Sequence, residues 1–231
     1  MTDFPRYAIY YAPQAVAPLA RFGAELLGYD AFTGNEVSLP AGLLTQFPDW
    51  PELTGDPRKY GFHGTLKAPF ALAPAMDEAG LIAACDGFAA SPRAIPVIAP
   101  VVRGISGFIA IVPAAPIAEL NALAQDCVEA FDRFRAPMTA ADRARRKPEA
   151  LTLRQVEQLD RFGYPYVRDD FRFHLTLTGR LPPEREAEVL AMLQARFAAL
   201  DLATLPIDRI VLFRQPHAQA RFSVVHEATL S

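Results

Sequence analysis

The sequence predicts an α+β fold of two similar lobes, each an antiparallel sheet with flanking helices, around a central cleft. Two observations lead to this prediction. First, the tripeptide His-x-Thr occurs twice, at 63–65 and at 174–176, in a chain of 231 residues with only four histidines. Second, each copy lies in a strand-like segment that is followed by a helix-like segment and two more strand-like segments. This shared order indicates an internal duplication, although the halves share little identity beyond His-x-Thr.

The first half begins with a predicted strand at 6–13, which is rich in aromatic and aliphatic residues and ends at a proline. A helix is expected over 18–28, because this segment starts with proline and ends with glycine. Residues 33–58 hold several prolines and glycines and should form a loop or a lid. The first motif strand, at 61–73, comes next. A helix over 76–91 follows, with acidic residues in its first turn.

Two strands, IPVIAPVVRG and GFIAIVPA, meet at a turn and close the first half. The clearest helical pattern lies over 116–135. Residues 136–170 form a polar insertion of one or two helices, and its helical part ends at Gly163. The second motif strand, at 171–181, precedes a helix over 182–200. The segments IDRIVLFRQP and ARFSVVHEATL are the last two strands. We expect residues 1–231 to form a single bilobal domain.

The composition fits an ordinary globular protein of the cytoplasm. Hydrophobic residues make up 51% of the chain and charged residues 21%, and the net charge is −3. The negative charge argues against general electrostatic attachment to nucleic acid, although a local basic groove is compatible with it. Two cysteines, Cys85 and Cys127, are too few for a disulfide framework. No signal peptide or membrane-spanning segment is expected from the pattern of apolar residues.

Alternation along a strand should place the polar groups of each motif on one face. His63 and Thr65 then point the same way, together with Lys67. In the second copy the polar face is formed by Arg172, His174, Thr176 and Thr178. The opposite face of that copy is entirely apolar, which anchors it on a core: Phe171, Phe173, Leu175 and Leu177.

Two imidazoles facing one phosphorus suit in-line displacement. Because imidazole titrates near neutrality, one ring can take a proton from the attacking hydroxyl or water while the other protonates the leaving oxygen. Threonine hydroxyls and a nearby cation can hold the non-bridging oxygens. This chemistry requires no metal ion, and no pair of histidines has metal-ligand spacing. The alternative is a pair of structural histidines beside threonines chosen for their strand propensity.

The paired segments resemble the 2H phosphoesterase superfamily, whose pattern of His, any residue, Thr or Ser, and an apolar residue occurs once per lobe. HGTL at 63–66 and HLTL at 174–177 both match it. A longer set of segments is similar to an uncharacterised branch associated with phosphonate metabolism: RYAIYYAP, YGFHGTLKAPF, ADRARR, GYPYV and FRFHLTLTGRL. The resemblance implies two lobes around a cleft, metal-independent phosphoester chemistry like that of RNA 2′,3′-cyclic phosphodiesterases, and His63, Thr65, His174 and Thr176 as the motif residues.

Five further residues are candidates for substrate binding, each with a structural alternative. Lys67 and Arg172, the cations beside the motifs, could bind an anion or belong to a hydrated strand edge. The basic run at 141–147 could bind an anion or form a hydrated helix face. In GYPYV, Tyr164 and Tyr166 could stack on a base or sugar or pack in a turn. The five residues predicted to contact substrate are Lys67, Arg172, Arg145, Arg146 and Tyr166. His217 and His226 lack the motif and should not be catalytic.

The sequence therefore predicts a phosphoesterase that needs no cofactor and acts on a cyclic phosphate or phosphodiester of a small ribose-containing metabolite. Its partner would be a phosphorylated metabolite or nucleotide, with RNA as a second option and no membrane. The alternative is a non-catalytic RNA or nucleotide-binding module with the same cleft. A long RNA partner would give strongly salt-dependent affinity, which a small metabolite would not.

Overall fold

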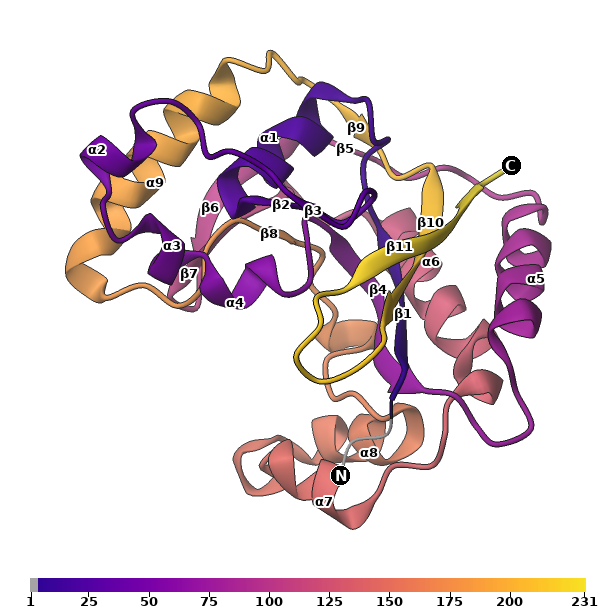
Figure 1. The fold of residues 1–231 in the computed structure, drawn as a ribbon. Helices are drawn as coiled ribbons and strands as arrows, with labels where there is room; N and C mark the ends of the chain where they lie inside the picture. The colour runs from indigo at the N-terminus through magenta and orange to yellow at the C-terminus, as the bar shows by residue number, and fades with distance from the viewer. Residues whose placement is uncertain (1–3) are drawn as a thin grey trace.

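A seven-stranded antiparallel sheet forms the centre of the chain in the computed structural model, which describes residues 4–231 (Figure 1). The order of the strands is β11-β10-β1-β4-β8-β7-β6, so strands from both halves of the chain join in one sheet. The predicted α+β class, with an antiparallel sheet flanked by helices, is confirmed. The strands are β1 (Arg6–Tyr11), β4 (Gly64–Ala71), β6 (Pro100–Ile105), β7 (Phe108–Pro113), β8 (Leu175–Thr176), β10 (Arg209–Gln215) and β11 (Ser223–Thr229).

The longer helices follow the local signals in the sequence. They are α1 (Pro18–Leu27), α5 (Glu78–Ala89), α6 (Ala118–Ala130), α8 (Leu153–Phe162) and α9 (Pro183–Ala198). Proline opens α1, and Gly28 ends it in the left-handed conformation at φ 68°. Thr152 and Gln155 form a capping box at the start of α8, which ends at Gly163. These five helices confirm the predicted helical segments.

The segment expected to be a loop contains short elements and is anchored to the core. It holds β3 (Asn35–Glu36), α2 (Leu43–Gln46), α3 (Trp50–Leu53) and α4 (Gly55–Arg58), and β3 pairs with β2 (Tyr29–Asp30). Phe47 and Trp50 are fully buried, and Trp50 Nε1 donates a hydrogen bond to the Leu26 carbonyl at 2.8 Å. A role of this segment as a lid stays a prediction.

The second motif strand is much shorter than expected, because only Leu175 and Thr176 join the sheet. Two residues beyond the strand, the side-chain oxygen of Thr178 accepts the hydrogen bond of the Ile109 amide at 3.0 Å. A side chain thus takes the place of a main-chain carbonyl at this point. The predicted alternation is nevertheless confirmed, since the four apolar residues of the segment are all buried in the main core: Phe171, Phe173, Leu175 and Leu177.

The two faces of the sheet have different surroundings. Alternate residues of β1, Tyr7, Ile9 and Tyr11, belong to the main hydrophobic core, which also includes buried residues of α5, α6 and α9. Ala8 and Tyr10 point the other way, into a smaller aromatic cluster with Phe213 and Phe222. The polar motif side chains lie on this second face.

The polar insertion projects beyond the sheet at the bottom of Figure 1. It contains α7 (Ala140–Arg145) and α8, with short 3₁₀ turns at Pro148–Ala150 and Arg168–Asp170. A two-residue ladder, β5 (Val97–Ile98) with β9 (Leu205–Pro206), lies at the opposite end of the molecule (Figure 1). None of the helices within residues 4–231 is long and apolar enough to cross a bilayer.

Candidate active site

The two His-x-Thr segments lie side by side in the sheet. Strands β4 and β8 pair antiparallel with Gly64 opposite Leu175. In this register His63 lies across from Thr176, and Thr65 lies across from His174. Because Gly64 and Leu175 face the core, all four motif side chains point to the other face of the sheet.

Glycine 64 permits this close pairing. A Cβ atom at this position would lie 2.6 Å from the ring of Phe173, which packs behind the strand. Glycine is therefore required at this position, where β4 packs against Phe173. Gly61, just before the motif, adopts φ 73°, a left-handed conformation that turns the chain into β4.

A main-chain carbonyl sets the orientation of His63. Its Nδ1 donates to the carbonyl of Gly61 at 2.9 Å, and a carbonyl can only accept, so Nδ1 carries the proton. The other nitrogen, Nε2, is then an acceptor and lies 3.3 Å from the hydroxyl of Thr65. Tyr10 stacks on the ring, with centroids 3.8 Å apart and planes 23° apart. These contacts hold a neutral imidazole with a basic nitrogen toward the hydroxyl.

The same arrangement recurs at the second motif. Nδ1 of His174 donates to the carbonyl of Arg172 at 2.7 Å, so its Nε2 is also left as an acceptor. Phe108 lies beside this ring at a centroid distance of 5.6 Å. In both copies the carbonyl two residues before the histidine fixes the tautomer.

Both imidazoles have lowered pKa values. Burial lowers the pKa of His63 to about 4; its hydrogen bond to Gly61 opposes this shift, and the nearby His174 adds to it. Burial also lowers the pKa of His174, against the hydrogen bond to Arg172. Both rings are therefore neutral at pH 7.

A cavity of about 390 Å³ opens in front of the motif residues. His63, Thr65 and Thr176 line it, whereas the ring of His174 stands next to Phe108, which is itself part of the wall. Arginines and tyrosines from distant segments complete the wall, and only one carboxylate, that of Asp56, takes part within the described residues. These other polar wall residues are Arg6, Tyr10, Asp56, Tyr60, Arg146, Tyr164, Thr178 and Arg180.

Comparison with known proteins places the chain in a family. Residues 65–223 match the family described as "Protein of unknown function (DUF1045)". The chain belongs to this family. The matched segment includes Thr65, His174 and Thr176 and starts two residues after His63.

Two curated relatives carry the name "Ribose 1,5-bisphosphate phosphokinase PhnN". The protein from Janthinobacterium sp. (strain Marseille) is 36% identical over 228 residues, which is 94% of this chain and 49% of the relative. The protein from Laribacter hongkongensis (strain HLHK9) is 32% identical over 219 residues, 94% of this chain and 50% of the relative. The chain thus spans about half the length of these curated relatives.

Lys67 does not share the face of His63 and Thr65. The register between β1 and β4 shifts at this point, with Tyr10 opposite Thr65 but Ile9 opposite Lys67, which is the mark of a β-bulge. The bulge turns Lys67 to the core side, where its Nζ donates to the Val128 carbonyl at 2.9 Å and to Asp132 at 3.0 Å. The predicted common face is therefore wrong for Lys67.

The other predicted binding residues divide between the cavity and its surroundings. Arg146 lines the cavity. Arg145 forms an ion pair with Asp142 and lines a neighbouring cavity. Arg172 is exposed, and its guanidinium donates to the carbonyls of Asp169 and Phe171. Tyr166 is 47% exposed and outside the cavity wall, which includes Tyr164 instead.

Sequence reasoning missed Tyr10, Arg6 and Arg180. Arg6, Ala8 and Tyr10 are alternate residues of β1, so their side chains lie on one face of the strand. No signal identified that face, because β1 is a central strand whose residues are buried on both sides. Among residues 4–231, no three His, Cys, Asp or Glu side chains are grouped so as to hold a metal ion.

Proposed function

We propose that the chain is a phosphoesterase that hydrolyses a cyclic phosphate or phosphodiester of a small ribose-containing metabolite by two-histidine acid–base catalysis. The observation that supports this proposal most directly is the pairing of Gly64 with Leu175, which puts both His-x-Thr motifs on one face of the sheet beside one cavity. The paired motifs also support membership of the 2H phosphoesterase superfamily.

The reaction would proceed by in-line attack of water on the phosphorus. Nε2 of one histidine takes a proton from the water as the new O–P bond forms. The P–O bond on the opposite side breaks, and its oxygen takes a proton from Nε2–H of the other, protonated histidine. The first ring has then gained a proton from water. The second ring has given its proton to the leaving oxygen and is neutral.

The electrostatics of the site fit such a division of roles. Both rings are neutral at pH 7, so the acid must gain a proton when substrate binds. An anionic phosphate favours the imidazolium form of a nearby histidine and raises its pKa toward the working range. The hydroxyls of Thr65 and Thr176 and the guanidinium of Arg180 can hold the non-bridging oxygens.

The name of the curated relatives points to a different reaction, which we assign to the half of those proteins outside the match. Transfer of phosphate from ATP commonly uses a Gly-x-x-x-x-Gly-Lys-Ser/Thr loop. In this chain the three lysines follow Arg58, Leu66 and Arg146, so the Gly-Lys step of that loop is absent. A ribose carrying phosphate groups is a natural common substrate class for the two halves, which supports the role in phosphonate metabolism that the sequence resemblance implied.

A panel of cyclic sugar phosphates and cyclic nucleotides, assayed with EDTA present, tests the proposal. We expect His63→Gln and His174→Gln each to lower kcat about 10²–10⁴-fold, the range for acid–base groups. His217→Gln is the matched control, since His217 is exposed and lies outside the cavity wall. Wild-type turnover in either motif variant would overturn the proposal. Tight binding without turnover would instead support the non-catalytic module.

A further inference from the structure

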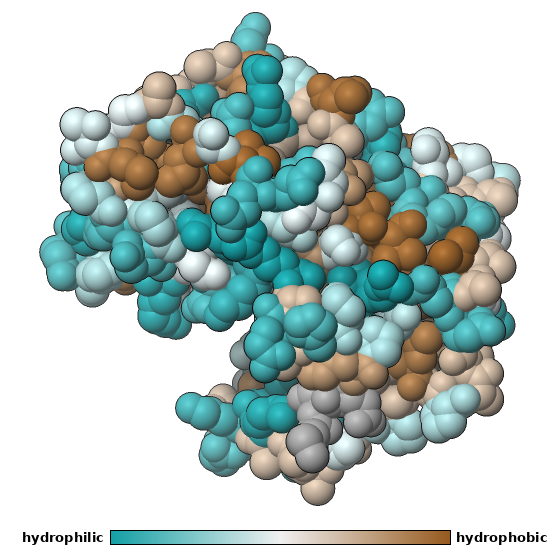
Figure 2. All heavy atoms as spheres, viewed as in Figure 1, coloured by the Kyte–Doolittle hydropathy of each residue, from teal (hydrophilic) through white to brown (hydrophobic). Residues whose placement is uncertain are grey.

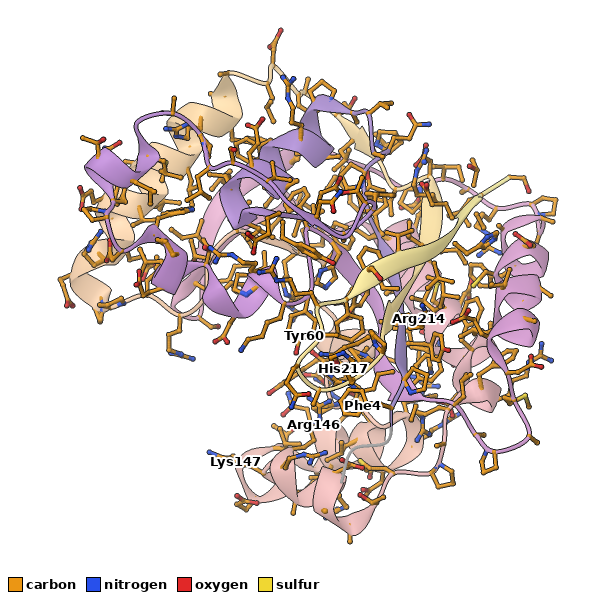
Figure 3. All side chains as sticks on the ribbon, viewed as in Figure 1. Phe4, Tyr60, Arg146, Lys147, Arg214 and His217 are labelled. Atoms are coloured by element: carbon orange, nitrogen blue, oxygen red, sulfur yellow. The ribbon has the colours of Figure 1, made fainter. Side chains whose placement is uncertain are left out.

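The cavity in front of the motifs continues into a second one. This neighbouring cavity, of about 320 Å³, extends toward α7 and Gly163 at the polar insertion. The two share four wall residues, Arg6, Tyr60, Pro69 and Arg146, so they form one continuous cleft with a narrow middle. Figure 2 shows a hydrophilic indentation above the insertion, and Figure 3 shows Tyr60 and Arg146 beside it.

The wall of this cleft is strongly cationic, although the whole chain carries a net charge of −3. Among the described residues, five arginines line it against two carboxylates, Asp56 and Asp142. Asp142 pairs with Arg145, and Asp56 pairs with Lys59. The five are Arg6, Arg135, Arg145, Arg146 and Arg180.

Arg6 and Arg146 stand at the junction of the two cavities and form no ion pair with any carboxylate of residues 4–231. Nε of Arg6 donates to Gln215 Oε1 at 2.9 Å, and its guanidinium lies 5.5 Å from the ring of Phe222. Arg146 lies over Tyr164 at 5.4 Å. Neutral groups and ring faces therefore position both guanidinium groups while their charges stay available to an anion.

Arg6 lies further along the cleft than the motif residues. Arg6 and Tyr10 lie on the same face of β1, four residues apart, which corresponds to about 13 Å between their Cα atoms. Tyr10 stacks on His63, whereas Gln215, directly across from Arg6 on β10, draws the Arg6 side chain sideways. Gln215 is itself held by a hydrogen bond to the Ala220 carbonyl at 2.7 Å. One ligand can therefore present two separate anionic groups to this cleft.

We propose that Arg6 and Arg146 bind a second phosphate, a monoester on a sugar carbon remote from the ester that the histidines cleave. This inference rests on the proposed function and makes the substrate a ribose cyclic phosphate with an additional terminal phosphate. The two phosphates on one ribose in the name of the curated relatives agree with this substrate class. Tyr60, between the two cavities, would contact the sugar.

Two substrates that differ in one group test the inference: ribose 1,2-cyclic phosphate with and without a phosphate on O5. We expect Arg146→Gln and Arg6→Gln to lower kcat/KM for the O5-phosphorylated substrate about 10- to 100-fold, as for lost charge-assisted hydrogen bonds. Both variants should lower kcat/KM for the other substrate at least about fivefold less. Lys147→Gln is the matched control, because Lys147 is the exposed neighbour of Arg146 and lines neither cavity. Equal losses on both substrates, or no loss, would overturn the inference while leaving the proposed function intact.

Calorimetric titration with ribose 5-phosphate separates the inference from the proposed function. This ligand has only the terminal phosphate, so its affinity reports on the arginines even if no cyclic phosphate is hydrolysed. We expect Arg146→Gln to weaken its binding at least about tenfold and His174→Gln to leave it unchanged. Undiminished binding in both arginine variants, or no binding to the wild type, would refute the second phosphate site. Arg146 is exposed at the end of α7, so its variant serves even if Arg6→Gln disturbs folding.

Discussion

Acidification from pH 7 to pH 5 should destabilise the fold through His63. Its pKa falls from the usual 6.5 to about 4 in the folded chain. Between these values the unfolded chain binds more protons than the folded one, so stability decreases as the pH falls. The contribution of His63 is fully present above about pH 6.5 and is lost as the pH falls toward 4. The linkage relation gives a loss of about 2 kcal/mol between pH 7 and pH 5.

Urea unfolding at the two pH values measures this loss. In His63→Gln the contribution is absent, so the variant should lose about 2 kcal/mol less stability than the wild type over the same interval. All other titrating groups are common to both proteins and largely cancel in the comparison. His217→Gln, at an exposed position, should follow the wild type. An identical pH dependence in wild type and His63→Gln would refute the claim that His63 is held neutral by burial.

Three further predictions concern the support of the site. Tyr10→Leu removes the ring stacked on His63 and should lower kcat about three- to tenfold with little change in KM. Tyr10→Phe keeps the ring and should retain the wild-type rate. Equal rates in both variants would exclude a positioning role. Asp132→Asn leaves the buried ammonium of Lys67 without its carboxylate and should lower the free energy of unfolding in urea by about 3 kcal/mol. Lys67→Met removes the charge itself and should cost less. The reverse order would contradict the ion pair. Gly64→Ala forces a methyl group against an aromatic ring and should cost about 1–3 kcal/mol, with a smaller effect contradicting the close approach.

The sequence predicted the elements whose signals are local. Pro18 and Gly28 delimit α1, Gly163 ends α8, and the alternation from Phe171 to Leu177 correctly separates a core face from a polar face. These features depend on conformational preferences of single residues or on the period of a strand. They can therefore be recognised without knowledge of neighbouring segments.

The features that failed depend on contacts between distant segments. The bulge that turns Lys67 to the core arises from the pairing of β4 with β1, and no residue in the segment 64–71 predicts it. The early end of β8 depends on Thr178 meeting Ile109 of another strand. The cavity wall likewise combines Arg6, Arg146 and Arg180, which only the folded topology brings together.

The carbonyl contacts of the two histidines have a consequence for how the site tolerates sequence drift. In many enzymes a carboxylate side chain orients the imidazole, and a single substitution there disables it. Here Gly61 and Arg172 contribute main-chain oxygens, which every amino acid possesses. The side chain at 172 can therefore vary freely without releasing its histidine. At 61 the left-handed backbone, and a Cβ atom that would lie 2.6 Å from that of Ala31, favour glycine. Divergent members of the family can keep the same ring orientation with different neighbours around it.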